Sequence, residues 1–208
     1  MTMQRLQMAR RRWLHWVGAG LVAGTWAQRE AWAVCAQPWA APAFTLPVLN
    51  EAAETMARHA SCADRAAHVS AHVCSEQLRG RWLYLDFWAS WCAPCRQSIP
   101  WMNQLQSRFS QTGLQVVGVS VDRQKNNAER FLNKLEAGFP MLWDPAGHCA
   151  QSYQVQAMPS SYVINPQGQV MSVHRGFNDV TAQALITQIG QLMQGACSDR
   201  ASQPGKTS

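Results

Sequence analysis

The sequence is short of charged residues, of acids in particular, and of long apolar runs. Its 208 residues include 18 Lys and Arg but 12 Asp and Glu, and 14% of the chain is charged. Five arginines and one acid lie within residues 1–33, which leaves 13 basic and 11 acidic residues in the rest of the chain. The excess of positive charge therefore belongs mostly to the N-terminus. No stripe of Lys and Arg with interleaved aromatics remains, which argues against nucleic-acid binding.

The N-terminal segment has the order of parts of an export signal. Arginines precede a mostly apolar run over residues 13–27, and Ala31-Trp32-Ala33 then offers small residues for cleavage. This run of about 15 residues is short for a bilayer span, which needs roughly 20. We predict a signal peptide over residues 1–33 and hence export to the periplasm. An uncleaved anchor in the inner membrane is the alternative, and Arg10–Leu14 also resembles a twin-arginine signal.

The remaining residues, about 175, suit one domain. Nearly continuous apolar runs predict buried strands over residues 81–89 and 114–121. Apolar spacing predicts helices over 92–109, 126–135 and 180–194, and a turn between 161–164 and 169–174 predicts a hairpin. This order indicates an α/β domain over residues 34–197, with a central mixed sheet flanked by helices. The polar residues 198–208 are predicted to be a disordered tail.

An Ala-rich stretch, residues 50–76, precedes the first of these strands and is predicted to be a helical insertion. Its histidines and cysteines could bind a soft or borderline metal such as copper or zinc: His59, Cys62, His68, His72 and Cys74. The alternatives are a Cys62–Cys74 disulfide beside solvated histidines, or free thiols. The chain has seven cysteines, so they cannot all pair within one chain, although export permits disulfides.

Cys92 and Cys95 form a C-x-x-C pair between the strand at 81–89 and the helix predicted from residue 92. A helix N-terminus stabilises a thiolate and lowers a cysteine pKa from about 8.5 toward 3.5–7.5. A zinc site would need a second ligand pair, and no second C-x-x-C is present. A c-type haem would need histidine where Arg96 stands. A structural staple would close too small a loop to remove much chain entropy. The pair therefore favours redox chemistry.

Asp86 lies in the middle of the apolar run at 81–89, six residues before Cys92. A buried carboxyl without a charged partner should have a raised pKa. Such a group could accept the proton of Cys95 when that thiol attacks a mixed disulfide. The alternative is an exposed strand residue, against which the apolar neighbours Leu85 and Phe87 argue.

The chain resembles the exported thiol–disulfide oxidoreductases of the TlpA/ResA type, which have the thioredoxin-like fold. The matching motifs are Ala43–Pro47, Leu78–Arg81, Phe87–Arg96, Val116–Asp122, Phe139-Pro140, Asp144–Gly147 and Met158–Gly168. The resemblance implies that Cys92 is the nucleophile, Cys95 the resolving cysteine and Asp86 the buried acid. It also implies a cis peptide before Pro159 that lies beside the disulfide.

If this cis peptide lies against the cysteine pair, Trp91 and Met158 would form an apolar rim around the sulfur. The Met158 backbone would then pair with an extended substrate strand. Two features depart from the family pattern: Ser98 stands where many relatives have glutamate, and the stretch 50–74 is longer.

The function implied is reduction of disulfides in cysteine-bearing periplasmic client proteins, for example in cytochrome c or copper-site assembly. The expected partners are those clients and a membrane thiol–disulfide electron donor, and the protein is expected to be a monomer with no cofactor. The alternative is a copper or zinc carrier that uses Cys92, Cys95 and a histidine, with His148 and His174 as candidates outside the insertion.

Overall fold

The structure is a computed structural model that describes residues 38–58 and 71–195. These residues belong to one compact unit of the chain. Several predictions fall outside the described residues: the signal peptide over 1–33, the tail over 198–208, and the metal or disulfide roles of His59, Cys62 and His68.

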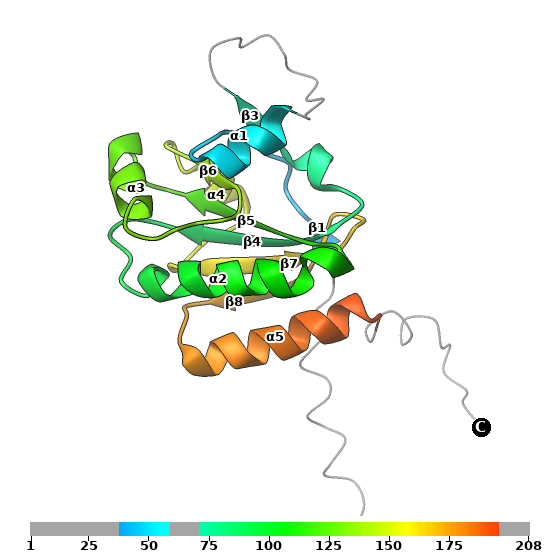
Figure 1. Cartoon of the computed structure of the whole chain (residues 1–208). Helices are drawn as coiled ribbons and strands as arrows, with labels where there is room; N and C mark the ends of the chain where they lie inside the picture. Colours follow the sequence, from blue (N-terminus) through cyan, green and yellow to red (C-terminus); the bar gives the residue numbers. More distant parts are fainter. Residues whose placement is uncertain (1–37, 59–70, 196–208) are drawn as a thin grey trace, which may run out of the picture. The chain divides into compact units, whose positions relative to one another are not determined.

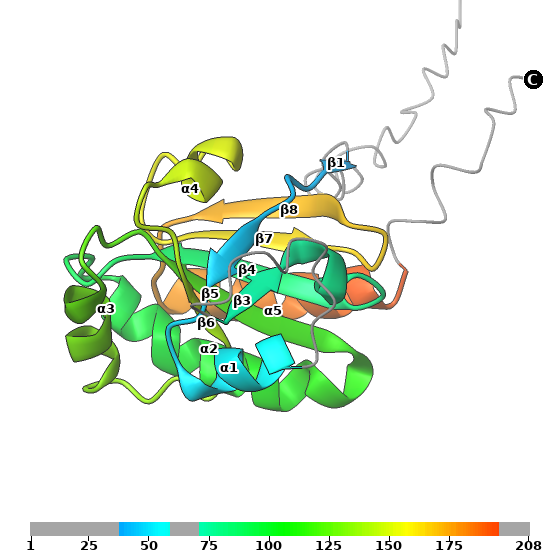
Figure 2. The ribbon, with the colours of Figure 1, turned by 90° about the horizontal axis from the view of Figure 1, so that it is seen from above.

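A six-stranded mixed sheet forms the centre of the domain, with strand order β1-β8-β7-β4-β5-β6. Its strands are β1 (Trp39–Ala40), β4 (Trp82–Trp88), β5 (Leu114–Ser120), β6 (Met141–Trp143), β7 (Ser160–Ile164) and β8 (Gln169–Arg175). β5 runs parallel to β4 and β6, whereas β7 is antiparallel to β4 and β8. Figure 2 shows β7 beside β8, with β1 at the edge of the sheet. The predicted mixed α/β sheet is confirmed.

Helices cover both faces of this sheet (Figure 1). On one face α2 (Cys95–Phe109) and α5 (Asp179–Met193) pack on the even-numbered side chains of β4, such as Tyr84 and Trp88. On the other face α1 (Glu51–Arg58) and α4 (His148–Ser152) pack near the odd-numbered side chains, such as Leu85 and Phe87. A further helix, α3 (Lys125–Leu132), adds Ala128 and Phe131 to the apolar cluster formed with α2 and α5. Side chains alternate along β4, so each of its faces is apolar, which explains the continuous apolar run.

The Ala-rich stretch before β4 is not helical throughout. α1 occupies its beginning, but His72–Cys74 forms a strand, β3, antiparallel to β2 (Thr45–Pro47). A short 3-10 helix, Ser75–Leu78, then leads to β4. The prediction of helix was therefore wrong at β3. Backbone pairing with β2 and the complete burial of Val73 outweigh a weak local preference for helix.

The helix predicted from Cys92 begins three residues later, at Cys95. Ala93-Pro94 forms a turn before it, and the N–H of Gln97 donates to the Pro94 carbonyl. Cys92 therefore lies just outside the helix end, where its sulfur can accept from the first N–H groups. Within the described ranges, no helix has the length and apolar character needed to cross a bilayer.

Candidate active site

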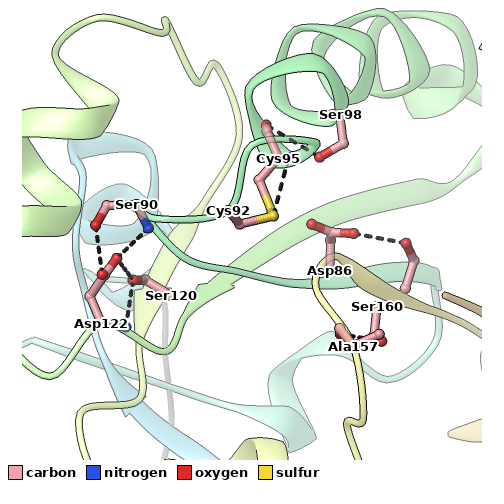
Figure 3. Close-up of a disulfide and its surroundings, with 10 residues drawn as sticks. Asp86, Ser90, Cys92, Cys95, Ser98, Ser120, Asp122, Ala157 and Ser160 are labelled. Atoms are coloured by element: carbon pink, nitrogen blue, oxygen red, sulfur yellow. Dashed lines mark hydrogen bonds between the residues drawn. A yellow bond between two sulfur atoms is a disulfide. The ribbon is translucent and has the colours of Figure 1, made fainter. Parts of the chain in front are cut away.

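The loop that carries Cys92 leaves the carboxyl end of β4 and is held by Asp122. Asp122 follows β5 and is buried, and its two oxygens accept from the N–H of Ser90 at 2.8 Å and from the Ser90 hydroxyl at 2.7 Å. The hydroxyl of Ser120 also donates to it, at 3.0 Å. Figure 3 shows these bonds beside the cysteine loop. They fix the backbone two residues before Cys92.

Cys92 and Cys95 form a disulfide with an S–S distance of 2.05 Å and a Cα–Cα distance of 5.3 Å. The N–H of Cys95 donates to the Cys92 sulfur at 3.2 Å, so the first free N–H of α2 points at that sulfur. Such a donor stabilises a thiolate after reduction. Cys92 is 4% exposed and lines a surface groove, whereas Cys95 is fully buried and is not among the residues that line it. This asymmetry gives Cys92 the access and the stabilisation that a nucleophile needs.

Asp86 is fully buried on β4, on the face covered by α2. Its Oδ1 accepts a 2.7 Å hydrogen bond from the Ser161 hydroxyl, and its Oδ2 has no partner. Burial raises the pKa of Asp86 to about 7, although the bond from Ser161 acts in the opposite direction. Its neighbours on the same face of β4, Tyr84 and Trp88, belong to the apolar cluster that contains both cysteines, and Figure 3 draws the carboxylate below the start of α2. A carboxyl with a pKa near neutrality suits proton transfer at physiological pH.

An apolar groove of about 470 Å³ opens beside Cys92. It is lined by Trp91, Cys92, Ala93, Pro94, Val155, Gln156, Ala157 and Met158. Trp91 is 69% exposed, which is unusual for so large an apolar side chain. The Met158–Pro159 peptide is cis, as the resemblance implied, and Pro159 is buried. Trp91 and Met158 thus lie at one groove with the sulfur, and the chemistry of its walls suits an apolar, extended chain.

Comparison with known proteins shows the family of this chain. The AhpC/TSA family profile matches residues 40–173, which include both cysteines, Asp86 and the cis-proline segment. The chain belongs to the AhpC/TSA family.

Individual relatives of this AhpC/TSA chain are named for thiol–disulfide chemistry. It is 31% identical over 99 residues to the thiol–disulfide oxidoreductase ResA of Bacillus subtilis, which is 48% of this chain and 55% of that protein. The ResA of Oceanobacillus iheyensis is also 31% identical over 99 residues, 48% of this chain and 52% of that protein. The chain thus spans about half the length of the curated relatives it matches. The predicted ResA-type resemblance is confirmed.

Solved structures extend the likeness to the whole domain. A crystal structure assigned as the thiol:disulfide interchange protein DsbE of Chlorobium tepidum is 35% identical, with a TM-score of 0.64. The match covers 76% of this chain and 99% of that chain. StoA of Bacillus subtilis, at 18% identity and a TM-score of 0.53, covers 71% of this chain and 96% of that chain and shares the fold. The predicted thioredoxin-like fold is confirmed.

Of the histidines and cysteines proposed as metal ligands in the stretch 50–76, the structure describes His72 and Cys74. Among the residues that the structure describes, no three His, Cys, Asp or Glu side chains form a group able to hold a metal ion. Cys74 takes part in a disulfide, and a disulfide sulfur cannot act as a thiolate ligand. Neither His148 nor His174 lines the groove at Cys92. The disulfide alternative for Cys74 is therefore favoured over the metal site, and its predicted partner, Cys62, lies outside the described residues.

Sequence reasoning missed the polar residues that hold Asp86 and the cysteine loop in place. Ser161 and Tyr84 reach Asp86 through hydrogen bonds, and Asp122 holds the cysteine loop. One signal for Asp122 was available, because an acid directly after the strand predicted at 114–121 falls at the same sheet edge as the C-x-x-C. Nothing local marked Ser161 as a partner of Asp86, since 75 residues separate them.

Proposed function

We propose that this protein is an exported thiol–disulfide oxidoreductase that reduces disulfides in periplasmic client proteins. One observation supports this most: three features occur together at the Cys92–Cys95 disulfide. They are the N-terminus of α2, a buried carboxyl with a pKa of about 7, and an open apolar groove. A structural disulfide needs neither the carboxyl nor the groove. The names of the ResA and DsbE relatives agree with the proposal.

In the first step the Cys92 thiolate, having lost its proton to solvent, attacks one sulfur of a client disulfide. A Cys92–client S–S bond forms, the client S–S bond breaks, and the second client sulfur leaves as a thiolate. The N–H of Cys95, which points at the Cys92 sulfur, stabilises the attacking charge. Because Cys92 borders the groove, the client sulfur can approach it without opening the domain.

In the second step Cys95 resolves the mixed disulfide. Asp86 accepts the proton of the Cys95 thiol, and the new thiolate attacks the Cys92 sulfur. The Cys92–Cys95 bond forms as the Cys92–client bond breaks, and the client leaves as a second thiolate. The two client thiolates take up two protons, which balance the proton that Cys92 gave to solvent and the proton that Asp86 took from Cys95 and then releases. Two electrons pass from the cysteine pair to the client, and the pair ends as the disulfide present here.

The groove favours flexible cysteine-bearing segments as substrates. Its walls are mostly apolar and include Trp91, Val155 and Met158. An extended client segment can pair with exposed main chain beside the sulfur, which supplies affinity with little demand on sequence. Clients in cytochrome c or copper-site assembly would present such segments.

The direction of electron flow requires a donor that reduces the Cys92–Cys95 disulfide again. A dithiol of a membrane thiol–disulfide protein would supply both electrons by the same exchange chemistry. We propose that the protein acts in the periplasm, because residues 1–33 have the pattern of an export signal, and that it acts as a monomer.

Three cysteine variants test this function. Cys92→Ser should abolish reduction of insulin, whereas Cys95→Ser should accumulate a mixed disulfide visible on non-reducing gels, because the resolving thiol is gone. Cys149→Ser is the matched control, because Cys149 is a free buried thiol away from the groove; it should keep wild-type activity.

If the Cys92→Ser variant reduces insulin at the rate of the wild-type protein, the proposal is refuted. Copper or zinc content is measured on the same reduced protein. Stoichiometric metal that depends on both active-site cysteines, without disulfide reduction, would support the metal carrier instead.

A further inference from the structure

Three buried residues of the β4–β7 pair form one hydrogen-bonded chain. The hydroxyl of Tyr84 donates to the Ser161 hydroxyl at 2.7 Å, and that hydroxyl donates to Oδ1 of Asp86 at 2.7 Å. All three side chains are at most 3% exposed. Each therefore depends on the others, because water cannot replace a lost partner.

The sheet register creates this arrangement. Asp86 lies directly opposite Ser161 across the antiparallel β4–β7 pair, and Tyr84 lies two residues earlier on the same face of β4. Directly opposite side chains are neighbours in a sheet. The serine hydroxyl can thus contact both residues of β4 at once.

The proton inventory fixes the direction of the chain. A serine hydroxyl has one proton and can also accept, whereas an ionised carboxylate only accepts. When Asp86 is charged, the serine proton must point to Oδ1, and the serine lone pair is then free to accept from Tyr84. Burial raises the pKa of Tyr84 well above its usual value, so the tyrosine remains a donor throughout the working range of the protein.

The second oxygen of Asp86 is left unused by this chain. Oδ2 is buried without a hydrogen-bond partner. Asp86 lies between Tyr84 and Trp88 on its face of β4, and both belong to the apolar cluster that contains Cys92 and Cys95. Figure 3 shows one carboxylate oxygen bonded away from the cysteine pair and the other on the side of the pair.

We propose that Tyr84 and Ser161 are positioning residues for Asp86: Ser161, which accepts from Tyr84, occupies Oδ1 and so reserves Oδ2 as the oxygen that accepts the Cys95 proton. This inference rests on the proposed function and adds an assignment of the reacting oxygen. Tyr84 and Ser161 act through Asp86 and not on the sulfur atoms themselves.

The other titratable groups around Asp86 are few. The loop after β4 contributes Cys92, α2 contributes Cys95 and β4 contributes Tyr84. β8 contributes His174, which lies opposite Ser161 in the β7–β8 pair. Burial lowers the pKa of His174, and the side chain of Gln188 on α5 acts in the opposite direction. In the oxidised protein the two cysteines do not titrate, so their ionisation does not overlap with the titration of Asp86.

The test is a titration of Asp86 by ¹³C NMR in the oxidised, aspartate-labelled protein. Ser161→Ala should raise the Asp86 midpoint by about one to two pH units, because a hydrogen bond to the charged form is lost. Tyr84→Phe should raise it by less, since the serine can still donate. Ser161→Thr keeps the hydroxyl and should restore the wild-type midpoint.

Two matched controls remove hydroxyls that do not reach Asp86. Tyr162→Phe deletes a buried phenol whose bond goes to the Tyr153 carbonyl. Ser172→Ala deletes a buried serine hydroxyl on β8 that contacts His174. Both should leave the midpoint unchanged. If Ser161→Ala fails to fold, Tyr84→Phe and Tyr162→Phe give the same comparison.

A second measurement follows the pH dependence of mixed-disulfide resolution by Cys95 in the same variants. Its midpoint should move upward together with the NMR midpoint. An NMR midpoint that is unchanged in Ser161→Ala and Tyr84→Phe refutes the hydrogen-bond chain. An NMR shift without a kinetic shift refutes the assignment of Oδ2. If the wild-type protein shows no disulfide exchange while the variants show the expected NMR shifts, the proposed function is refuted instead.

Discussion

Replacing Asp86 by asparagine should change how the stability of the protein depends on pH. The carboxyl is fully buried, and its pKa is raised from 3.8 to about 7 in the folded state, chiefly by burial. The native state therefore binds this proton more tightly than the unfolded state does. Its contribution to stability is fully present below the unfolded pKa and is lost as pH rises through the folded pKa.

The size of this loss follows from the shift. A difference of about three pKa units corresponds to about 4 kcal/mol, since each unit is worth about 1.4 kcal/mol. Between about pH 5 and pH 8 the wild-type protein should lose about 3 kcal/mol through this group alone. The asparagine of the Asp86→Asn variant carries no charge at either pH. Its amide would meet no partner at the position of Oδ2, but that cost, about 1–3 kcal/mol, is the same at both pH values.

The assay is urea unfolding of the oxidised protein at several pH values, for the wild type and Asp86→Asn. The unfolding free energy of the variant, relative to the wild type, should rise by about 3 kcal/mol from about pH 5 to pH 8. Glu136→Gln, which removes an exposed carboxylate, is the control and should run parallel to the wild type. A constant difference between Asp86→Asn and the wild type would show that Asp86 is not held with a raised pKa.

Further predictions concern the cysteine loop, the free thiol and the groove. Burial raises the pKa of Cys149 to about 12, so iodoacetamide should modify it far more slowly than the reduced active-site thiol; equal labelling by mass spectrometry would contradict this. Asp122→Ala leaves the N–H of Ser90 unpaired and should lower the unfolding free energy by about 2–4 kcal/mol in urea; Asp122→Asn should lose less. Trp91→Ala should barely change stability, because the side chain is 69% exposed, but should raise KM for a disulfide-bonded peptide several-fold. Trp39→Ala, at a tryptophan 38% exposed on β1, is its control and should leave KM unchanged.

The sequence by itself determined the central strands and the reactive pair. The run at 81–89 is apolar on both faces, and β4 is buried on both faces, so the local pattern carries the same information as the tertiary structure. The C-x-x-C likewise depends on short spacing, and its position between strand and helix needed no distant contact. Asp86 was identifiable because a single acid in such a run has little choice but to be buried.

Only the tertiary structure decided the features that depend on pairing between distant segments. β3 forms because His72–Cys74 finds β2 as a partner, which outweighs local helix preference. The start of α2 at Cys95 depends on the turn at Ala93-Pro94 and on the loop held by Asp122. The choice of Ser161 as the partner of Asp86 is set by the β4–β7 register. A shift of one residue would turn the serine to the opposite face, and nothing near either residue in the sequence specifies that register.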